Sequence, residues 1–132
     1  MDISLLCIDD KNNTVEFAGA NNPFWYIHNG VLTEIKGDKQ PIGTYYLELK
    51  SFTNHKVQVQ KGDSLYILSD GYADQFGGEK GKKFRYKQLQ EVLVSMVGVP
   101  MLEQEKVLID KLNKWKGNLE QVDDVLVIGI KI

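Results

Sequence analysis

The segment Leu65-Tyr66-Ile67-Leu68-Ser69-Asp70-Gly71 is the most informative stretch of this chain of 132 residues. Four apolar residues in succession are typical of a short strand that is buried on both faces. A carboxylate, Asp70, follows almost directly, and then a glycine, which allows the backbone to turn sharply. We therefore expect residues 64–68 to form a central strand and Asp70 to lie at the edge of the core.

A second acidic segment has the reverse order. In Gln121-Val122-Asp123-Asp124-Val125-Leu126-Val127, two carboxylates precede an apolar stretch that continues to Ile132. If the two strands are antiparallel neighbours, the end of one lies beside the start of the other. Carboxylates crowded there repel one another unless a cation offsets their charge, so the pair of segments predicts a site for Mg²⁺ or Mn²⁺ rather than zinc. Taken singly, each segment is more typical of an ordinary turn beside a strand.

The remaining sequence predicts an α+β protein. Alternating or clustered apolar residues predict hairpins over residues 3–17 and 24–35 and a strand over residues 55–60. Glycine-rich polar segments over residues 37–43 and 75–83 predict surface loops, the second of them flexible. Apolar residues at helical spacing predict two amphipathic helices, with stripes over residues 89–96 and 101–115. The apolar end of the chain, residues 125–132, predicts a strand covered on both faces.

Composition excludes several classes of protein. The formal net charge is −2, so no electrostatic surface large enough to hold nucleic acid is expected. No apolar run approaches the length of about 20 residues needed to cross a bilayer, and the amino end has no signal-peptide pattern, so we expect no membrane contact and a cytoplasmic location. The single cysteine, Cys7, stands among apolar residues and is expected to be buried.

The two acidic segments resemble motifs of a known family. Residues 61–75, which read KGDSLYILSDGYADQ, together with Asp123-Asp124-Val125-Leu126-Val127, are similar to the metal-dependent serine/threonine phosphatases related to protein phosphatase 2C, in their stage II sporulation protein E branch. The segment Ala18-Gly19-Ala20-Asn21-Asn22-Pro23 resembles that branch's Ala-Gly-His-Asn-Pro-Pro, and Gln40-Pro41-Ile42-Gly43 its Pro-Leu-Gly turn. The motifs occur in the family's order over essentially the whole chain.

The resemblance implies a fold, a reaction and a set of site residues. The fold would be part of an α-β-β-α sandwich with antiparallel sheets and two helices in the carboxy-terminal half. Two Mn²⁺ or Mg²⁺ ions would share a water that attacks phosphorus. Asp70 and Asp123 match metal-ligating aspartates and would act in catalysis through the metal, and Asp124 matches the second residue of the same motif. Asn21 and Asn22 would line the substrate cleft, although they are equally consistent with a capped turn.

The chain also departs from the family. The motifs expected before Ile3, an Asp in a Gly-Asp segment and an Asp-x-x-Gly-His-Gly segment, are not in this sequence, and Ala20 replaces the family's histidine. Residues 1–132 are therefore expected to be a single domain that forms the carboxy-terminal two thirds of a phosphatase domain. We expect this chain alone to hold few metal ions or none, and to expose a sheet face through which copies could associate. Its partners would be the missing part of the domain and an upstream sensor domain.

Two functions follow as hypotheses. The first is hydrolysis of phosphoserine or phosphothreonine on a bacterial regulatory protein. The second is a non-catalytic domain that keeps the phosphatase scaffold and binds a regulatory partner. A basic run beside Asp70, made of Lys80, Lys82, Lys83, Arg85 and Lys87, would attract phosphate or form a solvated loop.

Overall fold

The structure is a computed structural model that describes residues 1–43 and 50–132. The chain divides into two compact units. The first comprises residues 1–68 and 128–132, and the second comprises residues 69–127.

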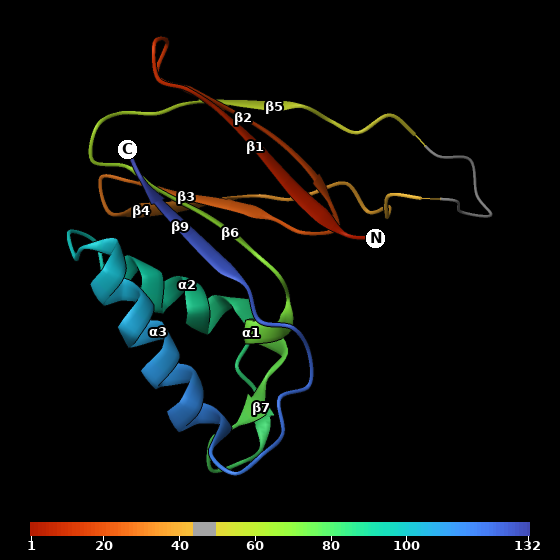
Figure 1. Cartoon of the computed structure of the whole chain (residues 1–132), viewed down its shortest axis with the longest axis vertical. Coiled ribbons are helices and arrows are strands. Elements are labelled where there is room, and N and C mark those ends of the chain that lie inside the picture. Colours follow the sequence, from red (N-terminus) through yellow and green to blue (C-terminus); the bar gives the residue numbers. More distant parts are fainter. Residues whose placement is uncertain (44–49) are drawn as a thin grey trace. The chain divides into compact units, whose positions relative to one another are not determined.

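The first unit holds two sheets in two layers (Figure 1). One sheet has the order β1-β2-β5 and consists of β1 (Ile3–Asp9), β2 (Thr14–Ala20) and β5 (His55–Gln58). The other has the order β4-β3-β6-β9 and consists of β4 (Val31–Ile35), β3 (Phe24–His28), β6 (Ser64–Leu68) and β9 (Val127–Lys131). The pairs β1–β2, β2–β5, β3–β4 and β3–β6 are antiparallel. The antiparallel α+β architecture predicted from the sequence is confirmed.

An apolar core lies between the two sheets of this unit. Its buried residues come from both layers, namely Val15, Phe17, Phe24, Val59 and Leu65. The rings of Phe17 in β2 and Phe24 in β3 have centroids 5.4 Å apart. The alternation of apolar residues along the strands therefore selects one face of each sheet for this core. The predicted central position of residues 64–68 is also confirmed, since β6 has neighbours on both sides.

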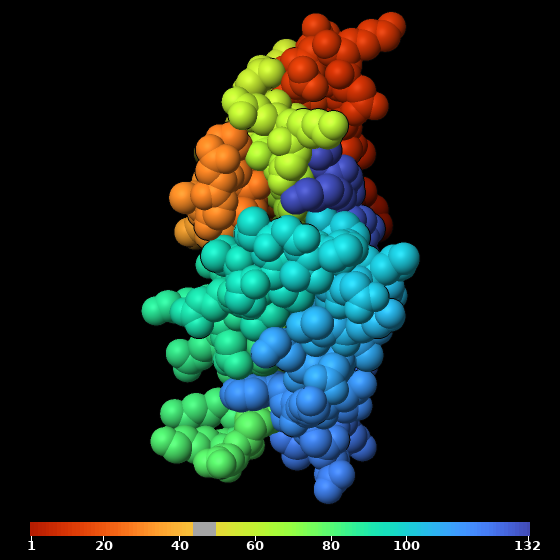
Figure 2. Space-filling model, turned by 90° about the vertical axis from the view of Figure 1, so that its left-hand side faces the viewer, coloured from red at the N-terminus to blue at the C-terminus, as the bar shows by residue number. Residues whose placement is uncertain are grey.

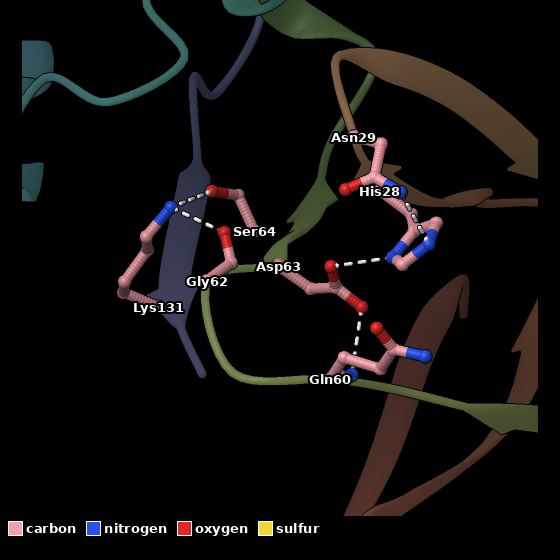
Figure 3. Close-up of polar contacts among 7 residues, drawn as sticks. All are labelled: His28, Asn29, Gln60, Gly62, Asp63, Ser64 and Lys131. Atoms are coloured by element: carbon pink, nitrogen blue, oxygen red, sulfur yellow. Dashed lines mark hydrogen bonds and ion pairs between the residues drawn. The ribbon is translucent and has the colours of Figure 1, made fainter.

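A polar network joins the loops at one end of the first unit (Figure 3). Asp63 is 4% exposed, and its Oδ1 lies 2.8 Å from Nδ1 of His28 at the end of β3. Its Oδ2 accepts a hydrogen bond of 2.8 Å from the backbone N–H of Gln60. Nearby, Nζ of Lys131 donates to the carbonyl oxygen of Gly62 over 2.6 Å. The buried carboxylate thus has partners for both oxygens, as burial of a charge requires.

The second unit is helical with one short hairpin. Its elements are α1 (Gly71–Asp74), β7 (Phe76–Gly77), β8 (Lys82–Lys83), α2 (Tyr86–Ser95) and α3 (Met101–Lys116). The two longer helices are those predicted from the apolar stripes. Phe84 fixes the hairpin to the helices, because its ring packs edge-on against Tyr72 at 5.1 Å and against Trp115 at 5.3 Å. None of the helices among residues 1–43 and 50–132 is both long and apolar enough to span a membrane.

Three predictions about local structure are wrong. Cys7 is exposed, because it lies on the face of β1 turned away from the core. The last strand begins at Val127, two residues later than predicted, and both Ile128 and Gly129 are exposed, so it is not covered on both faces by the described residues. Residues 75–83 are not simply a flexible loop, since they contain the paired strands β7 and β8 and the fully buried Gln75.

Candidate active site

The two acidic segments meet in the second unit, and Ser69 holds them together. The Ser69 hydroxyl donates to the carbonyl oxygen of Asp124 over 2.7 Å and accepts a hydrogen bond of 3.0 Å from the N–H of Leu126. The backbone N–H of Ser69 donates to the carbonyl oxygen of Leu126 over 3.0 Å. Ser69, the residue directly before Asp70, therefore forms three hydrogen bonds with the segment that carries Asp123 and Asp124.

Strand direction explains why these segments meet. In the first unit, the N–H of Ile132 donates to the carbonyl oxygen of Asp63, just before β6. In the second unit, Ser69, just after β6, pairs with Leu126, just before β9. The residue numbers rise along one strand while they fall along the other, as in an antiparallel pair. The end of β6 consequently lies beside the start of β9, which is the arrangement expected from the sequence.

Gly71 is needed for this close approach. A Cβ atom added to Gly71 would lie 2.3 Å from the carbonyl oxygen of Asp124 and 3.3 Å from the carbonyl carbon of Asp123. Gly71 is buried and begins α1, with Asp70 as the preceding residue. A side chain at residue 71 would push the two segments apart, so the Asp-Gly pair places a carboxylate and a close backbone contact at the same point.

The carboxylates themselves are exposed to solvent. Asp70, Asp123 and Asp124 are all exposed. Oδ1 of Asp123 accepts a hydrogen bond of 2.7 Å from the N–H of Asp124, whereas the Asp70 carboxylate forms no hydrogen bond or ion pair with any described residue. Oxygen atoms without a protein partner remain available to a ligand or a cation.

Gln75 was missed by the sequence analysis. It is fully buried, and its Nε2 donates to the carbonyl oxygens of Glu120 over 2.9 Å and Phe76 over 3.0 Å. The indole N–H of Trp115 donates to the backbone oxygen of Gln75 over 3.0 Å. Gln75 therefore fastens the end of α1 to the loop that leads to Asp123. The glycine-rich sequence around it suggested a loop, and the only hint of burial was its position between Tyr72 and Phe76.

The predicted substrate-binding residues lie in the first unit. Asn21 has a φ of +61°, and its Nδ2 donates to Oδ1 of Asp2 over 2.8 Å. Its backbone N–H donates to the carbonyl oxygen of Asp38, and that of Asn22 to Ala20. These contacts are those of a tight turn joined to the loop after β4. A role of Asn21 and Asn22 in substrate binding stays a prediction.

The donor set fits part of a metal centre. Carboxylate oxygens suit a hard divalent ion, and so do backbone carbonyl oxygens such as those of Asp123 and its neighbours. Among residues 1–43 and 50–132, however, no three Asp, Glu, His or Cys side chains are gathered closely enough to form a metal-binding group. Asp70 and Asp123 would therefore hold an ion only together with further ligands, and their role stays a prediction.

A family model decides the relationship to known proteins. The model of stage II sporulation protein E matches residues 1–132, which is the full length of the chain. The chain belongs to the stage II sporulation protein E family. A search of curated proteins found no match.

Solved structures of phosphatase domains share this family's fold. The chain is similar to the SiaA-PP2C domain of Pseudomonas aeruginosa, with 26% identity and a TM-score of 0.91 over 99% of this chain and 51% of that one. The manganese-presoaked phosphatase domain of SpoIIE from Bacillus subtilis has 16% identity and a TM-score of 0.75, over 100% of this chain and 56% of that one. The Mycobacterium tuberculosis serine/threonine phosphatase PstP has 16% identity and a TM-score of 0.64, over 97% of this chain and 58% of that one.

These comparisons confirm the predicted family and the predicted fold. The chain spans between about half and three fifths of the length of each solved chain. The structural similarity thus concerns the part of a phosphatase domain that contains the two sheets and the helical unit.

Proposed function

We propose that this chain is part of a metal-dependent phosphatase domain that removes phosphate from phosphoserine or phosphothreonine in a regulatory protein. The observation that carries the proposal is the junction at which Ser69 and Gly71 lie against Asp124. It brings the backbones of two acidic segments that are distant in the sequence into contact. Membership of the stage II sporulation protein E family, and the similarity to domains described as phosphatases, support the same function.

Asp70 and Asp123 would be the residues of this chain that hold the metal, with Asp124 beside them. A bound Mn²⁺ or Mg²⁺ ion lowers the pKa of its water and offsets negative charge on the phosphoryl oxygens. Ser69 and Gly71 fix the spacing of the two acidic segments, and Gln75 fixes the loop before Asp123. The remaining ligands would come from the rest of the phosphatase domain, which together with an upstream sensor domain is the partner we propose. A role of Asn21 and Asn22, in the first unit, in binding the substrate is part of the same proposal.

Release of phosphate by the full-length protein tests this function. We expect the full-length protein to release phosphate from a phosphothreonine peptide with Mn²⁺ or Mg²⁺ and not with EDTA. Asp70→Asn should reduce that release by at least 100-fold, on the order of the 10²–10³ found when a charge-stabilising group is removed from an active site. Asp10→Asn, which changes an exposed turn residue of the first unit, is the matched control. Full activity in Asp70→Asn would remove the metal-binding role of Asp70.

A second candidate is a non-catalytic domain that binds a regulatory partner. It is favoured by the lack of a group of three metal-ligating side chains in the described part of the chain. Calorimetric titration of the full-length protein with Mn²⁺ separates the two candidates. Saturable binding that Asp70→Asn weakens supports the phosphatase, whereas absence of binding, together with absence of phosphate release, supports the non-catalytic domain.

A further inference from the structure

The segment after α1 concentrates positive charge. Residues 79–87 carry five cations and one acid, a net formal charge of +4 in a chain whose total is −2. We name these cations, Lys80, Lys82, Lys83, Arg85 and Lys87, the basic hairpin. All five are exposed. Figure 2 shows the tip of the β7–β8 hairpin, in green at the lower left, projecting beside the blue end of α3.

The hairpin is held rigidly by its backbone. A Cβ atom on Gly77 would lie 1.9 Å from the carbonyl oxygen of Trp115, and the N–H of Gly78 donates to that oxygen over 2.8 Å. Phe84, at the base of the hairpin, is 3% exposed, and its N–H donates to the carbonyl oxygen of Gln75 over 2.9 Å. Charged side chains on such a fixed support lose less freedom on binding than those of a flexible loop.

Most of the positive charge is not neutralised. Nζ of Lys83 lies 3.0 Å from Oδ1 of Asp74, whereas the other four cations form no ion pair with any residue in the described ranges. Four cations on one short segment, next to a single acid, Glu79, with which none of them forms an ion pair, attract an anionic partner. The charge of the basic hairpin is therefore available for binding.

Arg85 occupies a backbone conformation that does not suit it. Its φ of +73° and ψ of 147° lie in a region that glycine populates and other residues avoid. A glycine here would be relaxed, so the backbone conformation does not call for an arginine. Arg85 forms no ion pair with any residue in the described chain. Because a non-glycine residue with this φ lowers stability, we infer that its side chain has a role outside the fold.

The basic hairpin is joined directly to the proposed active site. The N–H of Arg85 donates to the carbonyl oxygen of Ala73 in α1 over 2.7 Å. Lys83 pairs with Asp74, whose N–H in turn donates to the carbonyl oxygen of Asp70 over 2.9 Å. Both cations are thus attached to the single helical turn that begins beside Asp70.

We propose that the basic hairpin binds acidic residues that flank the phosphorylated serine or threonine of the substrate. This inference rests on the proposed phosphatase function, and it assigns the substrate class as acidic phosphopeptides. Arg85 and Lys82 are its specificity-determining residues, because neither forms an ion pair with a described residue, and Arg85 keeps a charged side chain where glycine would be relaxed. A phosphopeptide is favoured over nucleic acid because the cations occupy one short segment next to an acidic site, and not an extended surface.

Peptide binding measured without turnover tests the inference. Fluorescence anisotropy in EDTA compares two labelled phosphothreonine peptides, one flanked by three glutamates and one by three glutamines, on the full-length protein. We expect the glutamate peptide to bind about tenfold more tightly, and Arg85→Gln with Lys82→Gln to reduce that ratio to about one, since each exposed ion pair contributes modestly. Lys111→Gln, which changes an exposed α3 lysine that pairs with no acid among the described residues, should leave the ratio unchanged.

Arg85→Gly separates recognition from folding. The glycine relieves the positive φ, so we expect a higher melting temperature together with a loss of the preference for the acidic peptide. Equal binding of both peptides by the wild-type protein, or tighter binding of a single-stranded RNA oligonucleotide than of the acidic peptide, would overturn the inference. The binding assay in EDTA does not depend on turnover. Failure of the phosphatase function would appear in a separate assay, as absence of phosphate release from either peptide in Mn²⁺.

Discussion

Gly71 and Asp124 are in backbone contact although they are more than fifty residues apart in the sequence. A Cβ atom on Gly71 would lie 2.3 Å from the Asp124 carbonyl oxygen, and the neighbouring Ser69 hydroxyl donates to the same oxygen. The position of Asp70 relative to Asp123 therefore depends on a residue without a side chain.

Gly71→Ala should separate the two acidic segments. The added methyl group meets backbone atoms that cannot rotate away, so we expect a loss of about 1–3 kcal/mol in the free energy of unfolding by urea, and weaker Mn²⁺ binding. Gly30→Ala is the control, since its added Cβ meets nothing within 4 Å but keeps an unfavourable φ of +77°. That variant should lose about 1–2 kcal/mol without any change in Mn²⁺ affinity. Unaltered stability of Gly71→Ala would mean that the contact is not tight in solution.

Gln75→Leu should loosen the loop that leads to Asp123. It removes the donor to the carbonyl oxygens of Glu120 and Phe76 and leaves both without that partner, which costs about 1–3 kcal/mol. Gln75→Glu should cost more, because a carboxylate oxygen would face those carbonyl oxygens. Gln90→Leu on α2 is the control. Urea unfolding and Mn²⁺ titration measure the effects, and a Gln75→Leu protein with wild-type stability would contradict the proposed fastening.

Tyr72 should make the second unit sensitive to alkali. Burial raises the pKa of Tyr72 to about 12, and its hydroxyl donates to the carbonyl oxygen of Leu108 over 2.8 Å. The unfolded chain loses the Tyr72 proton near pH 10, and the folded chain loses it only near pH 12. The contribution of the neutral hydroxyl to the free energy of unfolding is therefore complete below pH 10 and is lost as the pH rises towards 12. Tyr72→Phe should be less stable by about 1 kcal/mol at pH 7.5. The gap to wild type, followed by urea unfolding, should narrow above pH 10, and a gap that does not change with pH would contradict the assignment.

The sequence predicts the strands, the two long helices and the meeting of the acidic segments because these follow from local patterns and strand direction. The apolar run of β6 ends at Leu68, and Ser69, which follows it, pairs with Leu126 in the segment before β9. The burial of Gln75 could not be predicted, since it depends on Trp115 and Glu120, which are distant in the sequence. The exposure of Cys7 depends on which face of β1 is turned to the core, and its apolar neighbours do not settle that.

A double-mutant cycle at Asp70 and Asp123 tests the central claim most directly. Phosphate release by the full-length protein in Mn²⁺ is measured for Asp70→Asn, Asp123→Asn and the double variant. If both carboxylates serve one metal centre, each single substitution removes most of the phosphate release. The double variant then releases phosphate no more slowly than the less active of the two single variants. Independent effects that multiply in the double variant, or wild-type release by either single variant, would contradict a shared site.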